Sequence, residues 1–137
     1  MDISTDESQP LAQVSGIVGP RIGKYRVNLK VLSSFAVAAF AHASGHSDLI
    51  AVDEVGPMEL LSPEFRSAVR SSVLESDKPS VCVVHKRFQD PLIDELRGCK
   101  NAAEFEITFE NRDALPQEIA KDIIQFLTTR NASGAKT

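Results

Sequence analysis

Apolar and polar positions follow two different patterns in the first part of the chain. In residues 28–43 apolar side chains recur at helical spacing behind a capping residue, Asn28, which predicts a helix. Residues 49–52 and 80–84 are instead short apolar runs without alternation, typical of strands buried on both faces of a parallel sheet. The expected apolar face of the helix consists of Leu29, Leu32, Phe35, Ala36, Ala39, Phe40 and Ala43.

Further helices are predicted from their start signals. Ser62-Pro63-Glu64 combines a capping hydroxyl, a proline at the first helical position and an acid near the positive end of a helix. Asp90-Pro91 starts a shorter helix, and Leu115-Pro116 starts the last one. Residues 104–109 alternate charged and apolar side chains, which predicts a half-exposed strand at the edge of the sheet.

The resulting order is helix, strand, helix, strand, helix, strand, helix. It predicts an α/β fold, with a three-layer parallel sheet that carries helices on both faces and right-handed crossovers. We expect a single domain over residues 11–127, which begins with a weak strand at residues 11–14. The polar residues 1–10 are expected to be a disordered N-terminus, and residues 128–137 a flexible tail.

Composition removes several classes of function. The net charge of −4 gives no electrostatic footprint for nucleic acid or an anionic membrane, so neither is expected as a partner. The chain has no apolar stretch of roughly 18 residues and its acidic first ten residues are unlike a signal peptide, so a cytoplasmic location is expected. No Cys/His set shows zinc spacing. His42 and His46 flank a helix end, where dipole compensation or simple exposure accounts for them.

The first predicted strand ends in two adjacent carboxylates, Asp53 and Glu54, followed by the turn formers Gly56 and Pro57. Two acids at the end of a buried strand are costly unless they bind a metal, meet water or take part in chemistry. A hydrophobic strand that ends in Asp-Glu has the form of a Walker B segment, in which the first acid holds Mg²⁺ and the second orients the attacking water. A helix cap or a surface turn is the open alternative for these acids taken alone.

His85 follows the second predicted strand. If the two strands lie side by side, Asp53, Glu54 and His85 share one rim of the sheet, where the imidazole would stabilise phosphate. A strand-end histidine satisfied by a loop carbonyl is the alternative. Cationic side chains near the same end, each with a solvated surface role as its alternative, are Arg66, Arg70, Lys86 and Arg87.

A phosphate cradle is the missing part of such a site. A P-loop carries Gly, four residues and then Gly-Lys-Ser/Thr between a strand and a helix, so that backbone N–H groups surround the phosphates. The nearest segment, Gly-Pro-Arg-Ile-Gly-Lys-Tyr at residues 19–25, has only three intervening residues. Pro20 also removes a backbone donor, and Tyr25 replaces the hydroxyl that would bind Mg²⁺. We therefore reject this segment as a P-loop.

Four stretches resemble one family, in the expected order. Val-Asp-Glu-Val-Gly-Pro-Met-Glu-Leu at residues 52–60, followed by Ser-Pro-Glu-Phe-Arg, resembles the Walker B region of the thermophile-type nucleoside-triphosphatase family. The animal member of this family is called cancer-related nucleoside-triphosphatase. The other matching stretches are Gly-Lys-Tyr-Arg-Val-Asn-Leu at 23–29, residues 83–95, and Glu-Asn-Arg-Asp-Ala-Leu-Pro at 110–116. The resemblance covers roughly residues 11–125.

The resemblance implies a P-loop NTPase that hydrolyses ATP, GTP and other nucleoside triphosphates to the diphosphate and phosphate with Mg²⁺. It implies that Asp53 is the metal-side acid of Walker B and Glu54 the water-activating acid. Asn111 and Arg112 lie in a family signature and would be either nucleotide-facing or structural. Family members begin with a P-loop strand and helix that these residues do not contain, so the chain resembles the carboxyl-terminal two thirds of the fold.

Without a cradle, nothing holds the γ-phosphate in line for attack, and positioning is nearly all of the catalysis in phosphoryl transfer. We therefore expect little or no nucleoside-triphosphatase activity from this chain alone. A second chain that supplies the P-loop, or self-association, is the expected partner, since a missing strand leaves sheet edge exposed. The alternative is a non-catalytic remnant that acts as a protein-interaction module.

Overall fold

The computed structural model describes residues 1–134, which form two compact units. The first unit covers residues 1–100 and the second begins at Asn101. The sequence analysis expected one domain over residues 11–127 instead. The boundary lies in a stretch of exposed residues, 100–107, that contains no helix or strand.

The first unit begins with a turn and a small antiparallel sheet. Residues 1–10, which were expected to be disordered, form a turn in which Asp2 N donates to Glu7 O at 2.8 Å. Strands β1 (Ala12–Gln13), β2 (Arg21–Ile22) and β3 (Tyr25–Val27) follow, in the sheet order β1-β3-β2. Strand β1 confirms the weak strand predicted at residues 11–14.

The first predicted helix is present as η1 (Val31–Ala36), a π-helical stretch, continued by α1 (Val37–His46). Asn28 begins it as predicted, because its Oδ1 accepts a hydrogen bond from Val31 N at 3.3 Å. Leu32 and Phe40 of the predicted apolar face are buried. The local capping signal and the helical spacing therefore located this element correctly.

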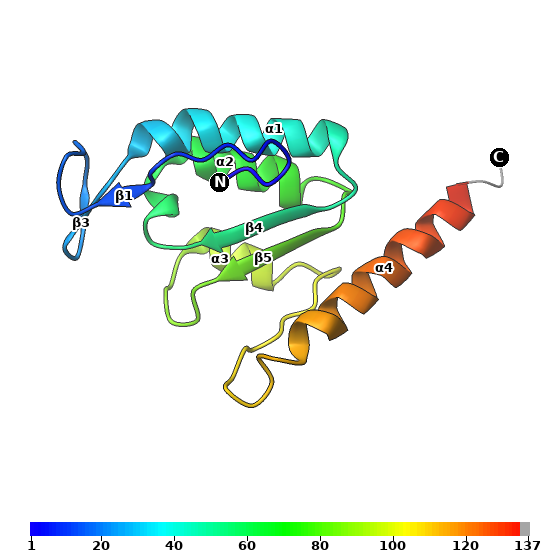
Figure 1. The fold of residues 1–137 in the computed structure, drawn as a ribbon. Coiled ribbons are helices and arrows are strands. Elements are labelled where there is room, and N and C mark those ends of the chain that lie inside the picture. The colour runs from blue at the N-terminus through cyan, green and yellow to red at the C-terminus, as the bar shows by residue number, and fades with distance from the viewer. Residues whose placement is uncertain (135–137) are drawn as a thin grey trace. The chain divides into compact units, whose positions relative to one another are not determined.

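Strands β4 (Ile50–Val55) and β5 (Ser80–Val84) pair in parallel, as predicted, with α1 and α2 alongside (Figure 1). Ile50 and Val52 of β4 are buried, whereas Ala51 is exposed and Val83 of β5 is 38% exposed. The prediction that these strands are buried on both faces is therefore wrong for this chain. An apolar run does not reveal whether the chain that carries it also supplies cover for the second face.

Two more helices start where their caps predicted. Helix α2 (Pro63–Val69) is capped by Ser62, whose Oγ accepts from Phe65 N at 3.1 Å, and η3 (Arg70–Leu74) continues it. Helix α3 (Pro91–Arg97) is capped by Asp90, whose Oδ1 accepts from Leu92 N at 2.9 Å. One hydrophobic core joins the helices, β4 and the end of β3, and consists of Val27, Leu32, Phe40, Ile50, Val52, Val55, Leu60, Phe65, Ala68, Val69, Leu92 and Ile93.

The second unit consists of a turn and a long helix, α4 (Leu115–Gly134). The edge strand predicted at residues 104–109 is absent from the described part of the chain, and the Phe105, Ile107 and Phe109 side chains are exposed. Alternation decides which side chains share a face, but a strand also needs a neighbour to pair with. Helix α4 extends past residue 128, the expected start of the tail, and residues 135–137 lie outside the described residues. No helix among the described residues is long and apolar enough to cross a membrane.

Candidate functional site

The two predicted acids lie at the carboxyl end of β4, where the pairing with β5 is irregular. Asp53 faces Val83 and Val55 faces Val84, so Glu54 has no opposite residue in β5. The peptide bond between Asp53 and Glu54 is cis. Asp53 is exposed and Glu54 is half-buried. A bulge of this kind redirects a side chain relative to regular strand alternation and is common next to active sites.

The absence of a side chain at Gly56 leaves room for acidic side chains beside the turn. A Cβ atom on Gly56 would lie 2.6 Å from Glu54 Oε1 and 3.1 Å from Glu59 Oε2. Two carboxylates therefore approach the same position beside the Gly56 backbone. The sequence analysis identified Gly56 only as a turn former, whereas the structure shows that the absence of its side chain admits Glu54 and Glu59.

Glu59 is a third acid at this rim, and the sequence analysis missed it. It belongs to η2 (Glu59–Leu61), a single 3₁₀ turn that brings its side chain back toward Gly56. Glu59 is only 9% exposed, and its Oε2 has no hydrogen-bond partner among the described residues. Burial, reinforced by the charges of Glu54 and Asp53, raises the pKa of Glu59 above its ordinary value. The one available signal was an acid within an apolar run, between Met58 and Leu60.

His85 lies on the same rim, because it follows β5 directly and β5 runs parallel to β4. Its Nδ1 accepts the backbone N–H groups of Arg87 and Phe88 at 3.3 and 3.2 Å. In the neutral ring this leaves the proton on Nε2, so His85 presents a hydrogen-bond donor suited to an anionic oxygen. No hydrogen bond joins His85 to Asp53 or Glu54 in the described part of the chain.

The cationic candidates Arg66 and Arg70 are occupied in ion pairs. Arg66 donates to Asp90 through Nη1 at 2.9 Å and Nη2 at 2.6 Å, and its Nε donates to Leu60 O at 2.7 Å. Arg70 forms a second two-bond pair, with Glu95 of α3. Arg66 therefore joins α2 to the cap of α3, and Arg70 joins η3 to α3, so both guanidinium groups are already engaged with carboxylates. Exposed cations next to His85 are Lys86 and Arg87.

Asn111 and Arg112 belong to the second unit. Asn111 Oδ1 accepts from Thr108 N and its Nδ2 donates to Glu106 O, both at 2.8 Å, so both ends of the amide stabilise the turn before α4. Arg112 lies over the Phe109 ring, 5.4 Å from its centroid, with 59% of its side chain exposed. These contacts give Asn111 a structural role in its turn, while the Arg112 guanidinium faces solvent.

The rim suits Mg²⁺ only together with a ligand that supplies further oxygens. Among residues 1–134, no group of three or more His, Cys, Asp or Glu side chains is arranged to hold a metal ion. Mg²⁺ is usually held by one or two carboxylates plus water and the phosphate oxygens of a nucleotide. Asp53 meets that requirement, because it is exposed and lies at the end of the strand.

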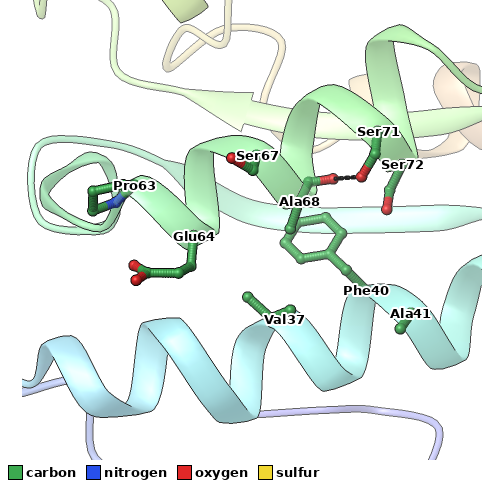
Figure 2. Close-up of a pocket in the computed structure, with 9 residues that line it drawn as sticks. All are labelled: Val37, Phe40, Ala41, Pro63, Glu64, Ser67, Ala68, Ser71 and Ser72. Atoms are coloured by element: carbon green, nitrogen blue, oxygen red, sulfur yellow. Dashed lines mark hydrogen bonds between the residues drawn. The ribbon is translucent and has the colours of Figure 1, made fainter.

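A groove with a volume of about 520 Å³ opens between α1 and α2, away from the rim (Figure 2). It is lined by Val37, Phe40, Ala41, Pro63, Glu64, Ser67, Ala68, Ser71 and Ser72. The Ser71 hydroxyl is already used, because its Oγ donates to Ala68 O at 3.2 Å. None of the three predicted rim residues lines the groove, so the candidate site is the open strand rim instead.

Comparisons with known proteins converge on one family. A family model described as NTPase matches residues 1–120. The nucleoside-triphosphatase THEP1 of Methanosarcina acetivorans is 40% identical over 126 residues, which are 92% of this chain and 69% of that protein. THEP1 of Thermofilum pendens is 37% identical over 125 residues, which are 89% of this chain and 67% of the relative.

A solved structure agrees with these sequence matches. The crystal structure of THEP1 from the hyperthermophile Aquifex aeolicus superimposes with a TM-score of 0.72 at 28% identity, over 80% of this chain and 66% of that one. The predicted α/β class is thereby confirmed. The chain spans about two thirds of the length of the relatives that it matches.

Proposed function

Since the chain belongs to the NTPase family, we propose that its strand rim is the metal- and water-binding half of a nucleoside-triphosphatase site. The substrate class is a nucleoside triphosphate, such as ATP or GTP, bound with Mg²⁺. The observation that carries this proposal is the position of Glu54, an acid at a strand bulge next to the exposed Asp53. Such a pair at the carboxyl end of parallel strands is where α/β folds bind ligands.

Each rim residue has a distinct role in this proposal. Asp53 would help to hold Mg²⁺, and Glu54 would accept a hydrogen bond from the attacking water and orient it toward the γ-phosphate. His85 donates its Nε2–H to a phosphate oxygen, because its Nδ1 is occupied by backbone N–H groups. When bound with the nucleotide, Mg²⁺ neutralises charge that develops on the phosphate oxygens. Asn111 and Arg112 are weaker candidates for nucleotide contacts, since the Asn111 amide is used in its own turn.

The phosphate cradle has to come from elsewhere. The rejected segment at residues 19–25 folds as the β2–β3 hairpin, in which Val27 N donates to Pro20 O at 2.9 Å and Arg26 Nη1 donates to Gly19 O at 3.1 Å. A Cβ on Gly19 would lie 1.9 Å from Val27 O, so this hairpin is closed on itself. We therefore propose that another segment or a second chain of different sequence supplies the P-loop to these residues.

Titration of a fluorescent nucleotide triphosphate in the presence and absence of Mg²⁺ tests the proposal. It is carried out with the chain alone and with an added fragment of the M. acetivorans relative that comprises the third not matched here. We expect tight, Mg²⁺-dependent binding only in the mixture, and at least about tenfold weaker binding for Asp53→Asn, since a metal-side acid is lost.

Asp48→Asn is the matched control, because Asp48 is exposed in the loop before the opposite end of β4. It is expected to bind the nucleotide like the wild type. Equal binding by the wild type and Asp53→Asn would contradict the proposed role of Asp53. The absence of nucleotide binding in every mixture would favour a non-catalytic interaction module.

A further inference from the structure

Two histidines lie together at the end of α1, on a different part of the first unit from the rim. His42 and His46 are one helical turn apart and both are exposed. Their rings are stacked, with centroids 4.5 Å apart and planes 14° from parallel. Two histidines at this spacing on one helix face are the arrangement with which zinc-binding helices hold their metal.

The ring of His46 has its metal-binding nitrogen available. Its Nδ1 lies 3.1 Å from the carbonyl oxygen of His42. A carbonyl can only accept a hydrogen bond, so Nδ1 carries the proton in the neutral ring and Nε2 keeps its lone pair. Metal-binding histidines commonly have their second nitrogen fixed by a backbone carbonyl in this way.

The ring of His42 is fixed in the same tautomer by a side chain of the N-terminal turn. Ser4 Oγ lies 3.3 Å from His42 Nδ1 and donates its own proton to Asp2 Oδ1 at 2.6 Å. A hydroxyl has one proton, so toward His42 it can only accept. The hydrogen bonds from Ser4 lower the pKa of Asp2, which keeps this carboxylate an acceptor. His42 therefore also has its lone pair on Nε2.

We propose that His42 and His46 bind a divalent transition metal of the zinc, copper and nickel class through their two Nε2 atoms. Ser4 with Asp2, and the His42 carbonyl, are the outer partners that orient the rings. Neutral imidazole suits these metals, whereas Mg²⁺ prefers oxygen ligands. The carboxyl end of a helix carries partial negative charge, which also favours a cation.

The site differs from a structural zinc site in having two protein ligands, with water completing the coordination. The sequence analysis found no Cys/His set with zinc spacing and attributed His42 and His46 to dipole compensation or simple exposure. The second observation, the matched tautomers, comes from contacts that the sequence does not reveal. Both exposed rings need to turn from stacking so that each Nε2 reaches a zinc ion at about 2.0–2.1 Å.

Metal binding would also tie the N-terminal turn to α1. Ser4 reaches His42 across 38 positions of sequence, and it contacts Nδ1, the ring nitrogen that the proposed metal does not use. Binding is therefore expected to slow protease cleavage within residues 1–10. This readout is independent of nucleotide and of the rim.

Calorimetric titration with zinc chloride tests the site in the full chain, reduced and with any affinity tag removed. We expect one zinc ion per wild-type chain, at least about tenfold weaker binding for His42→Ala or His46→Ala, and a smaller loss for Ser4→Ala. Copper is expected to bind more tightly than zinc, and magnesium is expected not to compete.

His85→Ala is the matched control, since His85 is also exposed but accepts hydrogen bonds at Nδ1, which leaves the proton on its Nε2. Zinc binding is expected to be unchanged in this variant. Unchanged zinc binding in the His42→Ala/His46→Ala double variant would overturn the proposal, as would the absence of saturable binding in the wild type. Circular dichroism of each variant confirms that the fold is retained.

Discussion

Glu59 and Asp90 are almost equally buried acids of the first unit, with 9% and 8% of their surfaces exposed. Their surroundings nevertheless shift the pKa values of the two carboxyl groups in opposite directions. Asp90 accepts two bonds from Arg66 and one from Leu92 N, which keep its pKa below the ordinary value. Glu59 has an unpartnered Oε2 next to Glu54, and its pKa is raised. Burial alone therefore does not decide what an acid does in this fold.

The different hydrogen bonding of the two acids distinguishes a carboxylate that stabilises the fold from one that lies beside the candidate site. Asp90 and its arginine join α2 to α3, and this ion pair has its hydrogen bonds satisfied within the chain. Glu59 is buried at a cost that nothing among the described residues offsets fully. Costs of this kind gather at functional sites, which agrees with the proposed role of the neighbouring Glu54.

The largest effect on stability is expected from Arg66→Ala. This substitution leaves Asp90 buried without its partner and is expected to destabilise the first unit by about 2–3 kcal/mol. The value is lower than for a fully buried pair, because 35% of the Arg66 side chain is exposed. Urea unfolding followed by circular dichroism measures it.

Arg70→Ala is the control for that measurement, since Arg70 and Glu95 form an equally direct pair with 43% of each side chain exposed. Its cost is expected to be clearly smaller than that of Arg66→Ala, because solvent screens this exposed pair. Equal costs for the two arginines would show that the burial of Asp90 does not matter.

A gain in stability is expected from Glu59→Gln. The native state holds the Glu59 proton to higher pH than the unfolded state does, so wild-type stability falls as pH rises through the range above the ordinary glutamate value. The substitution removes this loss and is expected to stabilise the protein by about 1 kcal/mol at pH 7. At about pH 4, where the glutamate is largely protonated in both states, the gain is expected to vanish.

Thermal unfolding of both proteins across this pH range checks the sign. Glu75→Gln is the control, because it makes the same chemical change at an exposed position. A Glu59→Gln protein that is less stable than the wild type at pH 7 would mean that the carboxylate form is favoured in the fold.

The smallest effect on stability is expected from Gly56→Ala, which should mainly change the position of the Glu54 side chain. The new Cβ would meet the far ends of the Glu54 and Glu59 side chains, at 2.6 Å and 3.1 Å, and Glu54 has to move the most, so the cost is expected to be about 1 kcal/mol. The displaced Glu54 should nevertheless lose its position for a water. Gly45→Ala in α1 is the control, because a Cβ atom at Gly45 would have no neighbouring atom within 4 Å. It is expected to stabilise the first unit slightly, since alanine favours a helix more than glycine does. Melting curves and nucleotide turnover in the complemented mixture separate the two effects.

The sequence predicted correctly those elements whose formation depends on one short segment alone. The caps at Asn28, Ser62 and Asp90 each begin a helix, and the runs ending at Asp53 and His85 form parallel neighbours. Two predictions failed because each depends on a neighbouring segment that no local pattern specifies. They are the strand at residues 104–109 and the burial of β4 and β5 on both faces.

The candidate site was predictable to a similar extent. Asp53, Glu54 and His85 could be placed on one rim, since parallel strands share their carboxyl ends. Glu59 could not, because its approach to Gly56 results from a turn rather than from spacing along a strand. Arg66 was one of four cationic candidates with a surface role as its alternative, and only the structure reveals its partner, the capping residue Asp90.

Phosphate release from Mg²⁺-GTP tests the central claim most directly. It is measured for the chain alone, for the chain with the part of the M. acetivorans relative that is not matched here, and for Glu54→Gln and the control Glu75→Gln in the same mixture. The account predicts no release by the chain alone, release in the mixture, loss of that release in Glu54→Gln and its retention in Glu75→Gln. Equal turnover by the chain alone, or release in the mixture that survives Glu54→Gln, would contradict it.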